Sequence, residues 1–231
     1  MALEPTYDEW RQSDYPAKGI TCQSCHFPTT QASRVNSGLP QAVRAHGGLP
    51  GAPSSLAGMA DQTDLLRQAA TLSLRAQRQD GELAAAVVIT NSGTGHYLPT
   101  GSDDLRQVWL EVTVRNQDGQ VVWQSGTLDR YGELDASTVQ FHKVIGDADG
   151  RPIALHRFWM ATQILNDTRL APGEVRTIPY RLPLPGAGPY TLSARLLYRD
   201  VSQGFAEFAL NHAAPDLPVR EIAQTSVVID P

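Results

Sequence analysis

Apolar and polar side chains alternate along most of the chain after residue 70. Nine short runs show this alternation or are enriched in β-branched residues, and they cover 71–77, 82–90, 108–116, 120–126, 139–145, 153–161, 174–182, 190–198 and 225–229. Turn-forming residues separate several of these runs, and 116–120 (NQDGQ) has the composition of a hairpin turn. Short strands at this spacing are typical of an antiparallel sandwich. We therefore expect a mainly β fold in which residues 71–231 form an antiparallel, Ig-like β-sandwich, with a short helix at 205–214.

Residues 1–70 lack this alternation and are rich in Gly, Pro, Ser and Ala. Short helices are predicted at 4–13 and 61–70, and 37–55, which Gly and Pro interrupt repeatedly, is predicted to be a wrapping loop. So few large apolar side chains would hardly bury a core of their own. The pattern thus divides the chain into an N-terminal segment, 1–70, and a sandwich, 71–231.

Composition and charge exclude some classes of function. Apolar residues make up 41% of the chain and charged residues 19%, which is ordinary for a folded globular protein. The net charge is −5 and no Lys/Arg cluster occurs, so nucleic-acid binding has no electrostatic support. No apolar run is long enough to predict a transmembrane segment.

The chain has two cysteines, Cys22 and Cys25, and His26 follows the second directly, in the order C-x-x-C-H. A structural zinc site needs four ligands, and no second C-x-x-C or His pair follows at suitable spacing. A thioredoxin-type pair belongs to a βαβ unit, which this sequence does not predict. A c-type haem site needs the motif as it stands, because two sulfurs one helical turn apart form thioethers with the haem and the adjacent histidine reaches the iron. The motif therefore favours one covalent haem c on Cys22 and Cys25, with His26 as the proximal iron ligand.

A haem also accounts for the N-terminal segment, because it supplies an apolar plate around which loops can wrap. Covalent attachment of haem c takes place outside the cytoplasm, so the motif implies a periplasmic or extracellular protein. The polar N-terminus, 1–19, has no apolar signal core. We therefore expect that a signal peptide has been removed from the exported chain.

Several side chains are candidates for the sixth iron ligand, on the face opposite His26. His46 is the first choice, because its Gly-rich loop can fold back over the porphyrin. His96 is the second, because it lies in a glycine turn expected at the mouth of the sandwich, and Met59 is the third. The further alternative is an open sixth position.

The other candidate residues have simpler interpretations. His142 and His156 lie on predicted strands, where histidine is more often a hydrogen-bonded, half-buried side chain than a ligand, and His212 lies in a predicted loop or helix end. Trp10 is close enough to the motif to pack against a haem. The remaining aromatic and acidic residues of interest are Trp109, Trp123 and Trp159, predicted to anchor the sandwich core, and Asp103 and Asp104, predicted to lie in a solvated turn.

Several segments resemble parts of bacterial multihaem c-type cytochromes. Residues 7–28 resemble the segment that carries a late haem in those proteins, and 43–51 resemble the Gly-rich loop that often follows it. Residues 90–126 and 166–174 resemble the β-sandwich domain that closes many of those chains. The resemblance implies that this chain corresponds to a terminal haem-plus-sandwich portion.

The chain departs from that pattern at informative positions. It carries one C-x-x-C-H motif where such proteins have several. Tyr15 and Pro16 stand where a histidine for another haem often precedes Ala17, and Phe27 stands where methionine is common. This portion alone therefore has no internal row of haems, so it either works with a partner cytochrome or is a fragment of a longer chain.

The leading hypothesis is an exported monohaem c-type cytochrome that exchanges electrons with a redox partner protein, another cytochrome. Such a carrier is not an enzyme, because two axial protein ligands leave no position for a substrate. A second hypothesis is a haem-based sensor or enzyme with an open iron site. A third is a structural docking subunit of a larger cytochrome complex, in which the haem only fastens the N-terminal loops.

Overall fold

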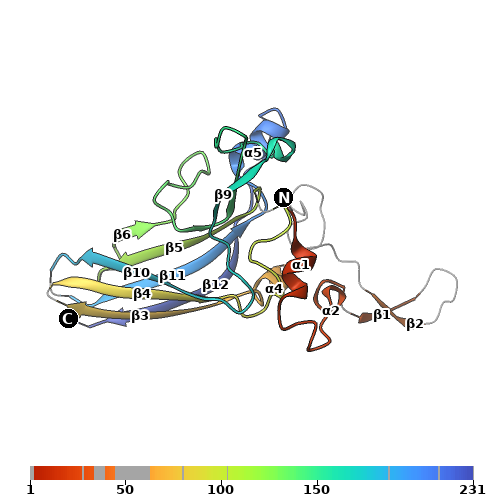
Figure 1. The fold of residues 1–231 in the computed structure, drawn as a ribbon. Helices are drawn as coiled ribbons and strands as arrows, with labels where there is room; N and C mark the ends of the chain where they lie inside the picture. Colours follow the sequence, from red (N-terminus) through yellow and green to blue (C-terminus); the bar gives the residue numbers. More distant parts are fainter. Residues whose placement is uncertain are drawn as a thin grey trace.

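Two antiparallel sheets form the larger part of the computed structural model (Figure 1). The structure describes residues 3–27, 29–33, 40–44, 63–79, 81–102, 104–186, 188–212 and 214–230. One sheet has the order β10-β4-β3, with bounds β3 Thr71–Gln79, β4 Glu82–Thr90 and β10 Val175–Pro183. The other has the order β12-β11-β5-β6, with β7 also paired to β5, and its bounds are β5 Gln107–Arg115, β6 Val121–Ser125, β7 Gln140–Phe141, β11 Tyr190–Arg199 and β12 Arg220–Ile229. The predicted antiparallel sandwich is confirmed.

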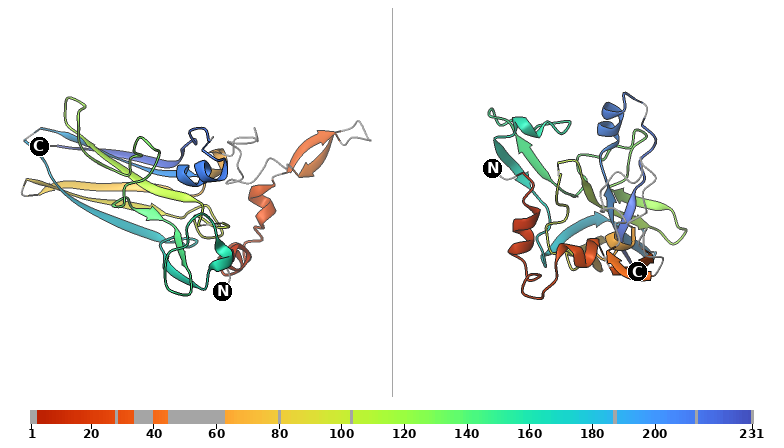
Figure 2. Two further views of the ribbon diagram at one scale, coloured as in Figure 1. Left: turned by 90° about the horizontal axis from the view of Figure 1, so that it is seen from above. Right: turned by 90° about the vertical axis from the view of Figure 1, so that its right-hand side faces the viewer.

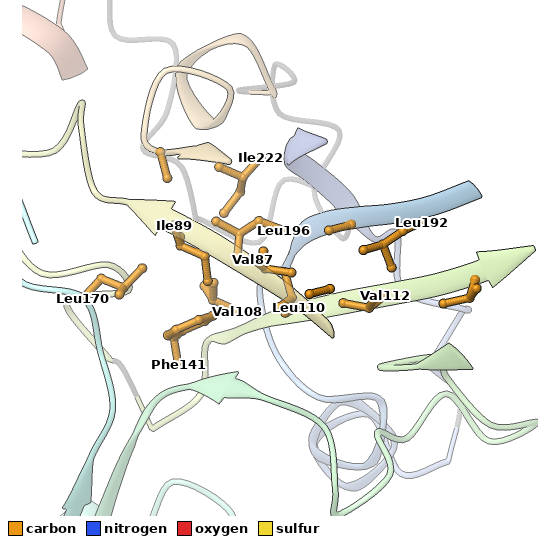
Figure 3. Packing of buried hydrophobic residues seen from close by; sticks show 14 of the residues in the cluster. Val87, Ile89, Val108, Leu110, Val112, Phe141, Leu170, Leu192, Leu196 and Ile222 are labelled. Atoms are coloured by element: carbon orange, nitrogen blue, oxygen red, sulfur yellow. The ribbon is translucent and has the colours of Figure 1, made fainter. Parts of the chain in front are cut away.

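The core lies between the two sheets and comes from the alternation that the sequence shows. Every second residue of β4 is buried, and Val87 and Ile89 are fully enclosed. Figure 3 shows them among side chains of β5 and β11, including Leu110, Val112 and Leu196. Each such side chain contributes roughly 1.5–3 kcal/mol by leaving water, so the facing rows hold the sheets together.

The predicted hairpin at 116–120 joins β5 to β6. The Asn116 amide N–H donates to the carbonyl of Gln120 at 2.9 Å, and Gly119 has a φ of 77°, which a side chain at that position would disfavour. The predicted helix at 205–214 is also present as α5, Gln203–Ala209. It begins after Ser202, whose hydroxyl accepts the amide N–H of Phe205 at 3.1 Å.

Residues 153–161 do not form the predicted strand. Leu155 and His156 both have a φ of 56°, in the left-handed region, and an extended strand requires negative φ. A short 3₁₀ turn, η1 (Phe158–Met160), follows them. A strand that the sequence analysis missed, β9 (Gln163–Asp167), pairs with β8 (Lys143–Gly146) in a separate two-stranded ribbon.

The predicted tryptophan anchors differ in burial. Trp109 is fully buried and its indole N–H donates to the carbonyl of Gly126 at 2.8 Å, as expected of a core anchor. Trp123 is partly buried against the core, edge-on to Tyr180. Trp159 is 71% exposed, so the prediction that it anchors the core is wrong. It lies on η1, where the expected strand is absent.

The N-terminal segment lies at one end of the sandwich. Figures 1 and 2 show it running from α1 through α2 to the hairpin formed by β1 and β2. Its elements are α1 Thr6–Arg11, α2 Cys22–His26, β1 Thr29–Ser33, β2 Pro40–Arg44 and α4 Thr63–Leu66. The helices predicted at 4–13 and 61–70 are therefore present in shorter form. Part of the predicted loop 37–55 is instead strand β2, which pairs antiparallel with β1. Within the described ranges, no helix is long and apolar enough to cross a membrane.

Candidate functional site

A cavity of about 690 Å³ lies between the N-terminal segment and the end of the sandwich. Its volume falls in the range of roughly 300–1,000 Å³ that is typical of cofactor and small-molecule sites. The walls are mainly apolar and aromatic, and they include Tyr7, Trp10, Leu65, Leu66, Leu98 and Pro99. The three residues of the C-x-x-C-H motif also line it, as does His96. The structure therefore brings these four predicted site residues around one space.

The short helix α2 presents the motif to the cavity. Thr21 and Ser24 form a capping box at its start, in which the Thr21 amide N–H donates to the Ser24 hydroxyl at 3.1 Å. Cys22 and Cys25 are three positions apart, so their side chains lie on the same side of the helix. Both are exposed free thiols, which leaves them accessible for covalent attachment.

His96 lies beside His26 although 70 positions separate them in the sequence. The two ring centroids are 6.1 Å apart and the ring planes differ by 19°. An imidazole nitrogen binds a first-row metal ion at roughly 2 Å and the ring centroid lies roughly 1 Å behind it, so two imidazoles on opposite sides of one ion have centroids roughly 6 Å apart. The observed spacing would allow His26 and His96 to hold one metal ion between them.

The hydrogen bond of His96 sets its tautomer. Its Nδ1 is 2.8 Å from the carbonyl oxygen of Tyr97, and since a carbonyl can only accept, Nδ1 carries the hydrogen. The lone pair is therefore on Nε2, the atom with which such a histidine binds a metal. In His26, Nδ1 is buried and has no hydrogen-bond partner among the described residues. An orphaned buried nitrogen fits a site that a bound group completes.

The protonation states also suit metal binding. Burial lowers the pKa of His26, and the nearby His96 lowers it further. Burial likewise lowers the pKa of His96, against the opposing effects of its hydrogen bond to Tyr97 and of the Glu9 carboxylate. Both imidazoles are therefore neutral at pH 7, which is the form that coordinates a metal.

The turn that carries His96 is held by a buried amide. Asn91 is 1% exposed, and its Nδ2 donates to the carbonyl oxygens of His96 and Leu170, each at 3.0 Å. The glycines of this turn allow close packing. A Cβ on Gly93 would lie 1.7 Å from the carbonyl oxygen of Gln68, and one on Gly95 would lie 2.8 Å from the Tyr15 ring. The sequence NSGTGH thus places a histidine on a turn pressed against the N-terminal segment.

The other predicted candidates lie elsewhere. His46, Met59 and Asp103 are outside the described residues, so their roles stay predictions. His142 lies between β7 and β8 and His212 follows α5; the cavity walls described above include neither. His156 is on a turn rather than on the predicted strand, and its Nδ1 is 2.9 Å from the Asp104 carboxylate. The Asp104 side chain is 14% exposed, so the prediction of a solvated turn is wrong for that residue.

The sequence analysis missed three residues, one that lines the cavity and two that support His96. Arg106 lines it and donates through Nη1 to the carbonyl of Asp200 at 2.9 Å. Tyr97 accepts the hydrogen bond from His96, and Glu9 on α1 is buried beside it. Glu9 stands in a helix whose other acidic residue is exposed, so no sequence pattern distinguished it.

Comparison with solved structures gives a match to a multihaem cytochrome. A penta-heme cytochrome c552 from Thermochromatium tepidum superposes with a TM-score of 0.66 at 25% sequence identity. The match covers 98% of this chain and 51% of that one, so the chain spans about half the length of the cytochrome. This chain is similar to part of a multihaem cytochrome c.

The remaining comparisons add no argument. A structure described as a β-galactosidase from Bacteroides fragilis gives a TM-score of 0.34 at 12% identity, over 70% of this chain and 17% of that one, which is too low to carry an inference. No family model matches the sequence, and no curated protein matches it. The structural match and the geometry of the cavity are therefore the basis for the function.

Proposed function

We propose that this protein is an exported c-type cytochrome that holds one covalent haem in the cavity and transfers electrons. The observation that carries the proposal is the pairing of His26 with His96 at a centroid distance of 6.1 Å, beside two free cysteines on the same helix. The likeness to a penta-heme cytochrome c552 supports the same cofactor class. When bound, haem supplies one-electron chemistry at its iron.

The chain's own residues have distinct roles in this proposal. The sulfurs of Cys22 and Cys25 would hold the haem covalently, and the imidazoles of His26 and His96 would bind its iron. Arg106 is the one Lys or Arg among the described residues that line the cavity, so its guanidinium would be the cationic partner for a haem propionate. The apolar and aromatic walls exclude water from the porphyrin faces.

Two histidine ligands favour electron transfer over ligand binding or catalysis, because they leave no open position for a substrate or a gas. They also imply a lower reduction potential than methionine would give, since a neutral imidazole is the stronger donor. His96 thereby replaces His46 as the proposed distal ligand, on the strength of its place in the cavity. The redox partner is proposed to be another cytochrome, in the periplasm or outside the cell, as the haem count of the similar protein suggests.

Optical spectra of three forms of the haem-loaded protein test the proposal. The wild type should be low-spin in both oxidation states, and its denatured mass should exceed that of the polypeptide by one haem. His96→Ala should convert the haem to high spin or open it to CO. His142→Ala is the matched control, because burial also lowers the pKa of that histidine but it does not line the cavity.

Two results would contradict the assignment. A wild type that is high-spin and binds CO readily would favour a sensor or enzyme. A low-spin His96→Ala protein that becomes high-spin only when His46 is also replaced would make His46 the ligand.

A further inference from the structure

A buried ion pair joins the N-terminal segment to the sandwich. Glu9 on α1 accepts from Arg169 with an Oε1–Nη1 distance of 2.9 Å, and each side chain is 5% exposed. A buried pair of this kind often contributes no more stability than well-packed apolar residues would. Its contacts with neighbouring groups therefore indicate what else it does.

Both members of the pair contact Tyr97, the residue next to His96. The Tyr97 amide N–H donates to Oε2 of Glu9 at 3.1 Å. The guanidinium carbon of Arg169 lies 4.7 Å from the centroid of the Tyr97 ring, in a cation–π contact. The Tyr97 carbonyl in turn accepts from Nδ1 of His96 at 2.8 Å. The ion pair thus holds the amide and the ring of Tyr97, the residue whose carbonyl orients the imidazole.

We propose that Glu9 is a positioning residue for the distal ligand: its carboxylate holds Tyr97 so that the Tyr97 carbonyl keeps the His96 imidazole in its iron-binding tautomer and orientation. The inference rests on the proposed function above. Glu9 also accepts from the Thr100 hydroxyl at 2.6 Å, so it holds the turn at a second point beyond Tyr97. Because Glu9 belongs to α1, the packing of the N-terminal segment against the sandwich determines the orientation of His96, which the sandwich carries.

The local arrangement offers a matched pair of variants. Arg169 also binds Asp167, with Nε–Oδ1 at 2.9 Å and Nη2–Oδ2 at 2.8 Å. Glu9→Gln and Asp167→Asn therefore each remove one carboxylate from the same buried guanidinium and leave the other in place. Within the described part of the chain, the Asp167 carboxylate accepts hydrogen bonds from Arg169 and none from Tyr97 or His96. A purely structural role predicts that both variants lower stability and that neither changes CO affinity or midpoint potential.

The measurements are CO affinity of the ferrous protein, midpoint potential and urea unfolding, on the haem-loaded full chain. Replacing a residue that orients a metal ligand typically lowers metal affinity roughly 10- to 100-fold. Glu9→Gln should raise the CO affinity by a similar factor, because CO competes with His96, and should raise the midpoint potential. Asp167→Asn should leave both quantities unchanged. Glu9→Asp, which keeps the charge but withdraws it by one methylene, should change CO affinity in the same direction and serves if Glu9→Gln does not fold.

Each outcome decides the inference. Glu9 variants that lower the unfolding midpoint as Asp167→Asn does, with unchanged CO affinity and potential, would overturn it. A wild type without low-spin haem would overturn the proposed function and this inference together. The wild-type spectrum alone distinguishes that failure from one in which only the Glu9 variants behave unexpectedly.

Discussion

Replacing Gly93 with alanine would place a methyl group against the backbone of the N-terminal segment. The added Cβ would lie 1.7 Å from the carbonyl oxygen of Gln68 and 2.7 Å from its carbonyl carbon. Real Cβ contacts are essentially never shorter than 3.0 Å, so the two segments would have to separate by about 1.3 Å, the difference between 3.0 and 1.7 Å. Neither contact atom can rotate away, because both belong to the backbone.

The cost of that change follows from the contacts that would be lost. Overpacking typically costs about 1–3 kcal/mol. The separation would also stretch the hydrogen bond from the Gly93 amide to the Ala69 carbonyl, now 3.0 Å, which contributes about 1 kcal/mol. We therefore expect the free energy of unfolding to fall by about 2–4 kcal/mol. Because Gly93 lies in the turn that carries His96, a high-spin haem fraction should appear as well.

Gly101→Ala is the control, because it separates steric overlap from backbone strain. Gly101 lines the same cavity and has a φ of 77°, but nothing lies within 4 Å of an added Cβ. Its replacement costs only the left-handed conformation, about 1–2 kcal/mol. Urea unfolding followed by tryptophan fluorescence, with visible spectra in parallel, measures both effects. Equal stability of the two variants, or a Gly93→Ala protein with an unchanged spectrum, would refute the reasoning.

Two further predictions concern a buried phenol and the cavity cation. Burial raises the pKa of Tyr180 from 10.0 to about 12, so its contribution to stability is present below pH 10 and is lost as the pH rises through 12. Between those pH values wild type should lose about 1–2 kcal/mol more than Tyr180→Phe, after allowance for partial exposure; identical alkaline losses in urea titrations would contradict this. Arg106→Gln should lower the midpoint potential, because a positive charge beside the proposed haem favours the reduced state, whereas Arg115→Gln, at the exposed end of β5, should not. Equal midpoint potentials of wild type and Arg106→Gln in voltammetry would contradict the proposal that Arg106 lies beside the haem.

Most of the sandwich could be predicted because buried and exposed positions alternate along the strands where apolar and polar residues alternate in the sequence. In β4, each apolar side chain of one face meets the core, so the pattern and the structure report the same physical constraint. β9 escaped prediction because all five of its residues are exposed, and no buried face imposes a period on them. The strand predicted at 153–161 was wrong because apolar residues in that run are not buried. Its apolar residues Phe158, Trp159 and Met160 are exposed on a turn, so their presence says nothing about a strand.

The C-x-x-C-H motif could likewise be predicted from spacing alone, because its residues are close together in sequence. The contacts that support His96 could not be predicted in this way. Glu9 and Arg169 are 160 positions apart, and no local pattern marks either as buried. The choice between His46 and His96 depended on which glycine turn the fold brings to α2. Each histidine stands in a glycine-containing turn, so local sequence did not decide between them. The structure places His96 beside His26, whereas His46 lies outside the described residues.

The arrangement of the proposed ligands gives the sandwich a larger role than docking. His26 belongs to the N-terminal segment and His96 to the loop after β4, so neither part holds both sides of the cavity. The two parts also share a core, because Leu66 and Ala69 of the N-terminal segment are buried in the cluster between the sheets. Separation of the parts would therefore expose apolar surface, break the Glu9–Arg169 pair and move the imidazoles apart in one event. Ligand geometry and assembly of the fold are coupled, and the proposed six-coordinate state depends on both segments at once.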